Sequence, residues 1–165
     1  NRIRGEGTYN HGYWRDVGTL DAFYEANMDV CAVHPQFNLY NHHWPIRTHN
    51  WNYAPAKFVF AGDEDGRRGE AIDSVISEGC ILSGGTVSES VLSPNCRIHG
   101  FAEVKGCILF PDVIVSRGAK LHNVIVDKGV LIPENFEAGL DKKADAERFH
   151  LTDEGLVVIP KDAVL

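Results

Sequence analysis

The residues best suited to bind a ligand or take part in a reaction lie near the start of the sequence, in the stretch GYWRDVGTL at positions 12–20. An aromatic ring, a cation and a carboxylate, Trp14, Arg15 and Asp16, come directly before Gly18 and Thr19. These three residue types directly before a predicted helix indicate a binding site for a polar ligand at the edge of a sheet. The spacing alone favours a plainer role, in which Asp16 pairs with Arg15 or caps the helix.

The run that follows predicts the helix that would position these residues. TLDAFYEANMDVC, residues 19–31, has Thr19 as a good N-cap and Asp21 near the positive helix N-terminus. Its largely apolar face consists of Leu20, Phe23, Tyr24, Asn27 and Cys31. We expect a helix that packs on another element. The next segment, rich in Pro, Trp, Asn and His, predicts an extended connector packed on the rest of the chain.

The second half of the sequence repeats with a period of 16 or 17 residues, in four lines that start at Ser74, Ser90, Cys107 and Val124. Its apolar positions align in three columns: Val75, Val91, Ile108 and Ile125; Leu82, Ile98, Val115 and Ile132; and Val87, Val104 and Leu121. Three apolar positions per line, about six residues apart, predict a coil with three short sides. Stacking would bury these columns, so the repeat predicts a β-solenoid. A short polar helix and one final strand are expected after the fourth line.

The composition predicts a soluble globular protein, because 44% of the residues are hydrophobic and no apolar run approaches the roughly 18 residues that span a bilayer. The net charge of −7 argues against nucleic-acid binding. The four cysteines, Cys31, Cys80, Cys96 and Cys107, form no C-x-x-C pair, so no structural zinc site is expected. We predict reduced, mostly buried thiols in a cytoplasmic protein. Cys80 and Cys96 stand at equivalent places in adjacent lines, where a disulfide is the less favoured alternative.

The three-sided periodicity resembles the left-handed β-helix of hexapeptide-repeat proteins, and the handedness comes from that resemblance alone. The blocks WRDVGT (14–19), HWPIRT (43–48) and PAKF (55–58) precede SVISEGCILSG, VIVDKGVLIPE and ERFHLTDEGLVVIPK. In this order, over nearly the whole chain, they resemble the C-terminal part of glucose-1-phosphate adenylyltransferase, also called ADP-glucose pyrophosphorylase. The resemblance implies a mainly β fold: a left-handed parallel β-helix of about four to five coils, preceded by the end of an α/β nucleotidyltransferase domain.

The implied division has three parts. Residues 1–36 would end the catalytic domain, 37–70 would be the connector, and 71–165 would be the regulatory and oligomerisation β-helix. The family makes ADP-glucose and pyrophosphate from ATP and glucose 1-phosphate, with Mg²⁺, for glycogen or starch synthesis. The start at Asn1 and the single methionine, Met28, favour a piece of a longer polypeptide, and no Gly-rich nucleotide loop is found in it. The chain alone is therefore expected to be inactive, and the parent to be a homotetramer.

The resemblance also implies site residues. Asp16 would be the second carboxylate near Mg²⁺ and the sugar phosphate, opposite an aspartate outside this sequence. Trp14 would support the sugar side or relay activator binding, and Arg15 is grouped with them as substrate-binding. Lys128, Arg97 and Lys161 match basic positions that bind phosphorylated sugar or nucleotide effectors. Lys128 and Lys161 are lysines where some family members have arginine, and lysine cannot make the bidentate contact with phosphate that arginine makes. The resemblance therefore leaves the effector's identity open.

Three alternatives stay open at this point. The basic residues could be solvated corner charges of a solenoid. The parent could be a non-catalytic regulatory or scaffold subunit of the same family, which the sequence of its N-terminal half would decide. The chain could also be a hexapeptide acyltransferase, which needs a catalytic histidine; His99 and His122 are the candidates within the coils. That third interpretation leaves the WRDVGT block unexplained.

Overall fold

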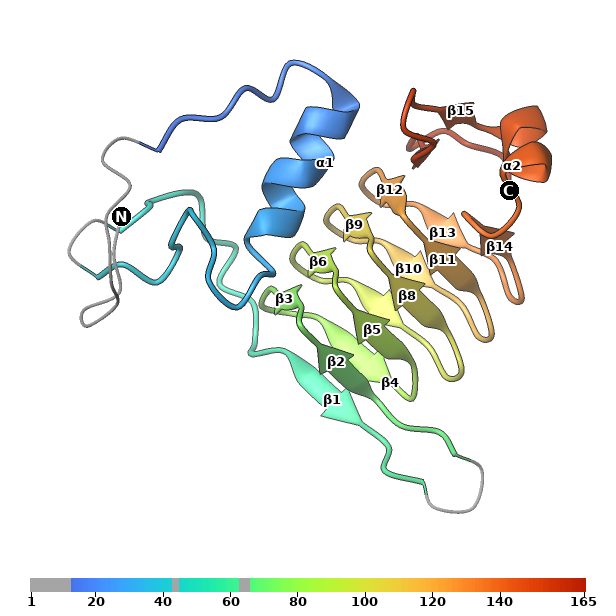
Figure 1. The fold of residues 1–165 in the computed structure, drawn as a ribbon. Coiled ribbons are helices and arrows are strands. Elements are labelled where there is room, and N and C mark those ends of the chain that lie inside the picture. Colours follow the sequence, from blue (N-terminus) through green and yellow to red (C-terminus); the bar gives the residue numbers. More distant parts are fainter. Residues whose placement is uncertain (1–12, 43–44, 63–65) are drawn as a thin grey trace.

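The computed structural model describes residues 13–42, 45–62 and 66–165 of the chain. The start of the HWPIRT block, His43 and Trp44, lies outside the described residues, as do residues 1–12 and 63–65. Short strands stack into a three-sided parallel β-solenoid, with one helix, α1 (Leu20–Asp29), standing along its side (Figure 1). The predicted mainly β fold of the left-handed hexapeptide type is thereby confirmed.

Each side of the solenoid is one sheet. The first face contains β1 (Lys57–Val59), β4 (Ile81–Ser83), β7 (Arg97–Ile98), β10 (Ile114–Val115) and β13 (Leu131–Ile132). The second face contains β2 (Glu70–Ile72), β5 (Thr86–Ser88), β8 (Glu103–Lys105), β11 (Lys120–His122) and β14 (Glu137–Ala138). The third face contains β3 (Val75–Ile76), β6 (Val91–Leu92), β9 (Ile108–Leu109), β12 (Val124–Val126) and β16 (Val157–Ile159), with β15 (His150–Leu151) antiparallel at its edge.

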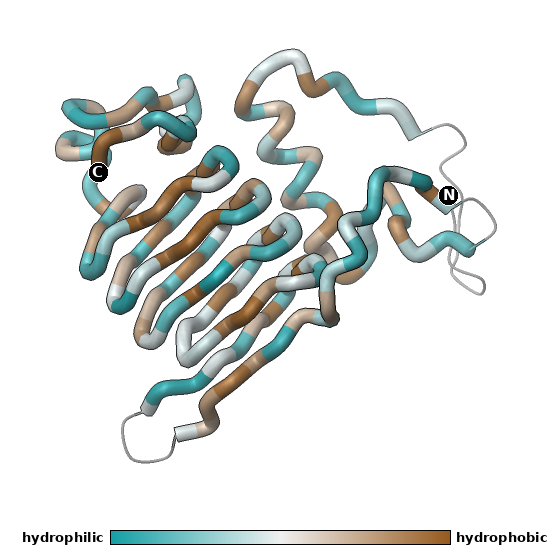
Figure 2. Tube along the Cα trace, turned by 180° about the vertical axis from the view of Figure 1, so that it is seen from behind, coloured by the Kyte–Doolittle hydropathy of each residue, from teal (hydrophilic) through white to brown (hydrophobic). Residues whose placement is uncertain are grey.

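Two of the three predicted columns form the core as expected. On the first face, Leu82, Ile98, Val115 and Ile132 are in register and fully buried. On the second face, Val87, Val104 and Leu121 are in register and fully buried. Hydrophobic segments therefore recur at the same places in successive coils (Figure 2). Because each coil shares its apolar surface with its neighbours, the core is continuous along the solenoid axis.

The remaining predicted column, Val75, Val91, Ile108 and Ile125, lies on the third face. Its residues are in register but do not point into the core, which corrects the prediction. The core cluster contains instead the next residue along each strand, Leu92, Leu109, Val126 and Ile159, together with Val124 on β12 and Val157 on β16. Successive side chains of a strand point to opposite sides, so Ile108 and Ile125 point outward. They are nevertheless buried, at 2% and 4% exposure, because this face is covered from outside. The Phe23 ring of α1 stacks on Phe110 next to β9, with the ring centroids 6.1 Å apart.

The expected helix and strand after the fourth line are both present. α2 (Lys142–Arg148) is capped by Asp141, whose side chain accepts from the backbone N–H groups of Lys143 and Ala144. β16 then adds to the third face beside β12. Strand β1 comes from the segment predicted as connector, and β2 begins at its last residue; both pair with solenoid strands, while the division into three domains stays a prediction. Neither α1 nor α2, nor any other described segment, forms an apolar helix long enough to cross a bilayer.

All four thiols are free, as predicted, and three of them are fully buried: Cys80, Cys96 and Cys107. Cys80 Sγ donates to the Ser93 carbonyl at 3.2 Å, and Cys96 Sγ donates to the Phe110 carbonyl at 3.3 Å. Burial raises the pKa of the Cys107 thiol to about 12. The thiols therefore serve as small core side chains that satisfy carbonyls at the coil corners.

Candidate functional site

Trp14, Arg15 and Asp16 lie in the extended segment that leads into α1. Trp14 is 81% exposed, and Asp16 is also exposed. Asp16 Oδ1 accepts a hydrogen bond from the Gly18 backbone N–H at 3.2 Å, and the helix cap is Thr19, as predicted. Arg15 does not pair with Asp16: its Nη2 lies 2.6 Å from Glu25 Oε2 within α1. The turn thus holds an indole and a carboxylate toward solvent at the N-terminal end of the helix.

The expected magnesium site is not complete within this part of the chain. Among the described residues, no group of three or more His, Cys, Asp or Glu side chains is placed to hold a metal ion. Asp16 could supply one carboxylate oxygen, whereas Mg²⁺ takes octahedral oxygen coordination that commonly includes one or two carboxylates and substrate phosphates. The residues present fit a Mg²⁺ site only as one contributor among several, and we derive no catalytic step through the metal.

The structure brings Lys128 and Lys161 to the same corner of the solenoid. The pairing of β12 with β16 sets Val126 opposite Ile159, and the Asp127 N–H donates to the Ile159 carbonyl at 2.9 Å. Each lysine is the second residue beyond this paired position. Because adjacent strands are about 4.8 Å apart, the two backbones stack one coil above the other. Both residues are exposed, so this corner presents two ammonium groups to solvent.

Arg97 lies apart from that corner. It is half-buried on β7 of the first face, in register with Ile114 and then with Leu131. Two strand spacings, about 10 Å, therefore separate it from β13, the strand that follows Lys128. Its Nη2 lies 3.5 Å from Asn95 Oδ1, and Asn95 in turn donates to Asp112 Oδ1 at 2.7 Å. Arg97 is thus part of a polar ladder along a coil corner, and an effector role for it stays a prediction.

Two basic residues near Lys161 were missed by the sequence reasoning. A cleft of about 480 Å³ beside the β15–β16 hairpin is lined by Arg148, His150 and Pro160, among others, and Pro160 directly precedes Lys161. The Arg148 guanidinium lies over the rings of Phe136 and Phe149, 4.7 and 4.9 Å from their centroids. The signal in the sequence is the block ERFH, but nothing in its spacing shows that it folds back beside Lys161.

Tyr24 attaches the middle of α1 to the solenoid. Its hydroxyl donates to the Gly106 carbonyl at 2.7 Å and lies 3.3 Å from Asn123 Oδ1, at a corner between the second and third faces. Burial, with a smaller contribution from nearby acidic groups, raises the pKa of Tyr24 from 10.0 to about 12. The neutral phenol is therefore the form that the folded state favours.

We expect Tyr24 to make the folded chain lose stability as the pH rises from 10.0 to about 12. A phenol with a raised folded-state pKa contributes its full stability below the unfolded pKa, and this contribution is lost as the pH passes through the folded value. Urea unfolding of the wild type and of Tyr24→Phe, measured at pH 8 and at steps to about pH 12, isolates the contribution. The variant should be less stable at pH 8, and the difference should shrink at high pH. The exposed Tyr40→Phe is the control; an equal narrowing there would contradict the assignment.

The three-sided solenoid is shared with a known protein family. The model of a family described as GlmU-like, C-terminal hexapeptide matches residues 54–159, which include every strand of the three faces. The chain belongs to this family. A GlmU-like hexapeptide domain is the type of solenoid that the 16–17-residue period predicted, and the match begins before β1, in agreement with the pairing of β1 and β4.

Curated relatives of this hexapeptide-family chain carry the name glucose-1-phosphate adenylyltransferase. One from Koribacter versatilis is 53% identical over 91% of the chain, and one from Anaeromyxobacter sp. is 50% identical over 98%. One from Bifidobacterium longum is 47% identical over the full chain. The matches cover 36%, 39% and 40% of those proteins, so the chain spans well under half of their length. The expected resemblance to a C-terminal portion of this enzyme is confirmed.

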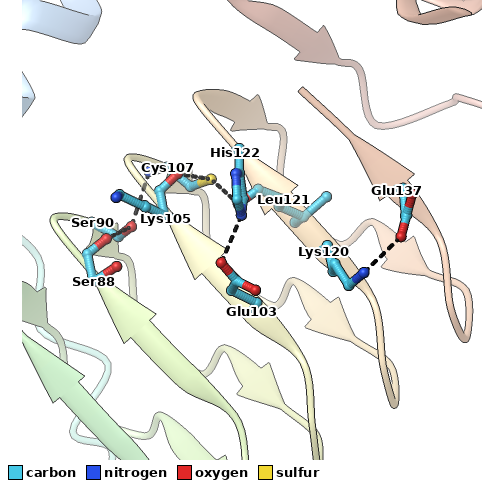
Figure 3. Close-up of polar contacts among 9 residues, drawn as sticks. All are labelled: Ser88, Ser90, Glu103, Lys105, Cys107, Lys120, Leu121, His122 and Glu137. Carbon is cyan, nitrogen blue, oxygen red and sulfur yellow. Dashed lines mark hydrogen bonds and ion pairs between the residues drawn. The ribbon is translucent and has the colours of Figure 1, made fainter. Parts of the chain in front are cut away.

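The histidines considered for an acyltransferase lie on the outer surface of this hexapeptide domain. His99 is exposed, and His122 Nε2 lies 2.8 Å from Glu103 Oε1 on the neighbouring strand of the second face (Figure 3). Beside them, Lys120 Nζ lies 2.9 Å from Glu137 Oε1. Lys120 and Glu137 are in register on adjacent strands, whereas His122 and Glu103 are diagonal neighbours, two positions apart in the register. Both are usual arrangements of cross-strand polar pairs on a solvent-facing sheet. Together with the names of the relatives above, this geometry favours a structural ladder over an acyltransferase site.

Proposed function

We propose that this chain is the regulatory portion of an enzyme that makes ADP-glucose and pyrophosphate from ATP and glucose 1-phosphate, for glycogen or starch synthesis. The observation that carries the proposal is the identity of 47–53% to proteins named glucose-1-phosphate adenylyltransferase over 91–100% of the chain. This identity extends beyond the solenoid into the segment that carries Trp14 and Asp16, since the Bifidobacterium longum match includes every residue.

The segment of Trp14 to Asp16 forms one edge of the sugar-phosphate site in this proposal. Its support is the exposure of the Trp14 ring and of the Asp16 carboxylate, which leaves both side chains accessible to a ligand. The Gly18 N–H fixes one Asp16 oxygen and thereby orients the carboxylate. Asp16 would hold sugar hydroxyls or share a metal ion with carboxylates from the rest of the protein, and Trp14 would support the sugar ring.

The corner of Lys128 and Lys161 binds the phosphate groups of an effector. Two ammonium groups one coil apart can neutralise a dianionic phosphate. The nearby cleft adds Arg148 and His150, although the acidic Glu147 also lines it. A bound phosphate would also meet the exposed Lys128–Gly129 turn, where the Lys128 N–H is already occupied by Asp127 Oδ1 at 2.7 Å. Side-chain charge rather than backbone donors is therefore the main attraction, and binding should weaken with added salt.

Calorimetric titration of the chain with fructose 1,6-bisphosphate, fructose 6-phosphate, glucose 6-phosphate, AMP and sulfate tests the effector site. We expect at least one phosphorylated ligand to bind, and Lys128→Ala to weaken it about tenfold or more, because a charge-assisted contact is lost. Lys105→Ala, which removes an exposed lysine from the second face, is the matched control and should bind as the wild type does. Equal affinity of both variants, or no binding of any ligand, would reject an effector site formed by this corner.

A further inference from the structure

The N-terminal end of α1 is tied to the C-terminal hairpin by one hydrogen bond between residues far apart in the sequence. Thr152 Oγ1 donates to Asp21 Oδ1 at 2.5 Å, in a partly buried position. Asp21 stands in the first turn of the helix, where the positive end of the helix dipole favours a carboxylate. In Figure 1 the hairpin of β15 and β16 lies beyond the same end of α1.

The Thr152 hydroxyl is itself held firmly within the hairpin. Its oxygen accepts from the Leu156 N–H at 3.1 Å, while the Thr152 N–H donates to the Leu156 carbonyl at 3.0 Å. The Gly155 N–H closes the same turn onto the Thr152 carbonyl at 2.9 Å. One side chain thus joins this hydrogen-bonded turn to the first turn of the helix.

The bond between Thr152 and Asp21 lies between two parts of the candidate functional site: the corner of Lys161 and the segment of Asp16. In one direction the turn leads into β16, three residues long, and then through Pro160 to Lys161 at the effector corner. In the other direction, Asp21 lies two residues beyond the Thr19 cap, and Gly18 bonds to Asp16 just before it. Two other hydrogen bonds to the solenoid lie further along, from Tyr24 in the middle of α1 and from Cys31 just past its end.

We propose that Thr152 is a positioning residue: through Asp21 it fixes the first turn of α1, and it carries displacements of the Lys161 corner to the segment that holds Asp16. The effector part of this proposal rests on the proposed function, whereas the fixing of the helix does not. Removal of the hydroxyl should leave α1 attached at Tyr24 but loosen its first turn. The same loss should separate the effector corner from Trp14 and Asp16.

Two variants remove the bond from opposite sides. Thr152→Val deletes the donor, and Asp21→Ala deletes the acceptor while leaving the turn from Thr152 to Leu156 intact. Thr152→Ser retains the hydroxyl and is the rescue variant. Thr86→Val makes the same chemical change as Thr152→Val on β5 of the second face and is the matched control. Amide hydrogen exchange by NMR on this chain reads out the first turn at Ala22 and Phe23, whose N–H groups bond to Thr19.

We expect exchange at Ala22 and Phe23 to accelerate about tenfold in Thr152→Val and in Asp21→Ala, because a hydrogen bond to a charged group is lost. Thr152→Ser and Thr86→Val should exchange as the wild type does. Unchanged exchange in both deletion variants would overturn the positioning role, whatever the effector corner does.

A second measurement on the same samples tests the transmission. Addition of fructose 1,6-bisphosphate should shift the amide signals of Lys128 and Lys161 in all variants, but those of Asp16 and Gly18 only where the Thr152 hydroxyl and the Asp21 carboxylate are both present. Shifts at Asp16 and Gly18 that persist in Thr152→Val would overturn transmission through this bond. No shift at Lys128 or Lys161 in the wild type would instead reject the effector corner, and with it transmission, while the exchange result would still decide the positioning role.

Discussion

Gly139→Ala is expected to destabilise the chain by about 3 kcal/mol or more, since left-handed backbone strain and a steric collision add. Gly139 follows β14 with φ +83°, a backbone conformation that L residues adopt at a cost. A Cβ atom at this position would overlap the carbonyl oxygen of His122 on the preceding coil. The coils stack too closely for either backbone to withdraw without breaking the ladder between β11 and β14. Urea unfolding followed by circular dichroism measures the loss.

Gly129→Ala is the matched control for this prediction. Gly129 also has a positive φ, +70°, but apart from its chain neighbours no heavy atom of the described residues lies within 4 Å of the position that its Cβ would take. It should therefore incur only the backbone strain, about 1–2 kcal/mol. Equal destabilisation by the two substitutions would show that the close approach of Gly139 to the preceding coil is not a determinant of stability.

Leu109→Ala is the second substitution with a large expected effect. Leu109 is fully buried in the third-face column of the core, in register with Leu92 below and Val126 above. Its neighbours belong to hydrogen-bonded ladders on all three faces, so the coil cannot collapse into the space left by the side chain. We expect a loss of about 2–5 kcal/mol in the free energy of unfolding.

The same substitution at Leu131 distinguishes burial from residue type. Leu131 is 59% exposed on the outer surface of the first face, and Leu131→Ala should change the free energy of unfolding by about 0.5 kcal/mol or less. Thermal or urea unfolding of both variants decides the question. If Leu131→Ala were as damaging as Leu109→Ala, the assignment of inward and outward residues would be wrong.

The sequence predicted the solenoid well because its period survives in the structure. The columns of Leu82 and of Val87 are in register, since each coil adds 16 or 17 residues and returns the chain to the same face. The third face differed because adjacent apolar residues of its strands are both buried, as in Ile108–Leu109, whereas the first face exposes one of each pair, as in Leu131–Ile132. A strand buried on both sides shows no alternation, so the pattern cannot tell which residue points inward. The outer cover that makes both positions apolar is α1, an element outside the repeat.

The candidate site was only partly predictable for a similar reason. The turn before α1 and its cap at Thr19 follow from local sequence, and the structure contains both. The bond between Asp21 and Thr152 joins residues 131 apart in sequence, and only the addition of β16 to the third face brings them together. The stacking of Lys128 and Lys161 depends on the same strand pairing, which no periodicity reveals because helix α2 interrupts the repeat.

Formation of ADP-glucose from ATP and glucose 1-phosphate tests the central claim most directly. The assay compares this chain alone with a longer protein, in which the chain is fused to the part of a relative that the chain does not cover. The longer protein is assayed as wild type and as Asp16→Asn. We predict no product from the chain alone, product from the longer protein, and about a 100-fold lower kcat/KM for Asp16→Asn, since one carboxylate of the sugar-phosphate site is neutralised. ADP-glucose made by the chain alone, or an unchanged kcat/KM in Asp16→Asn, would contradict the account.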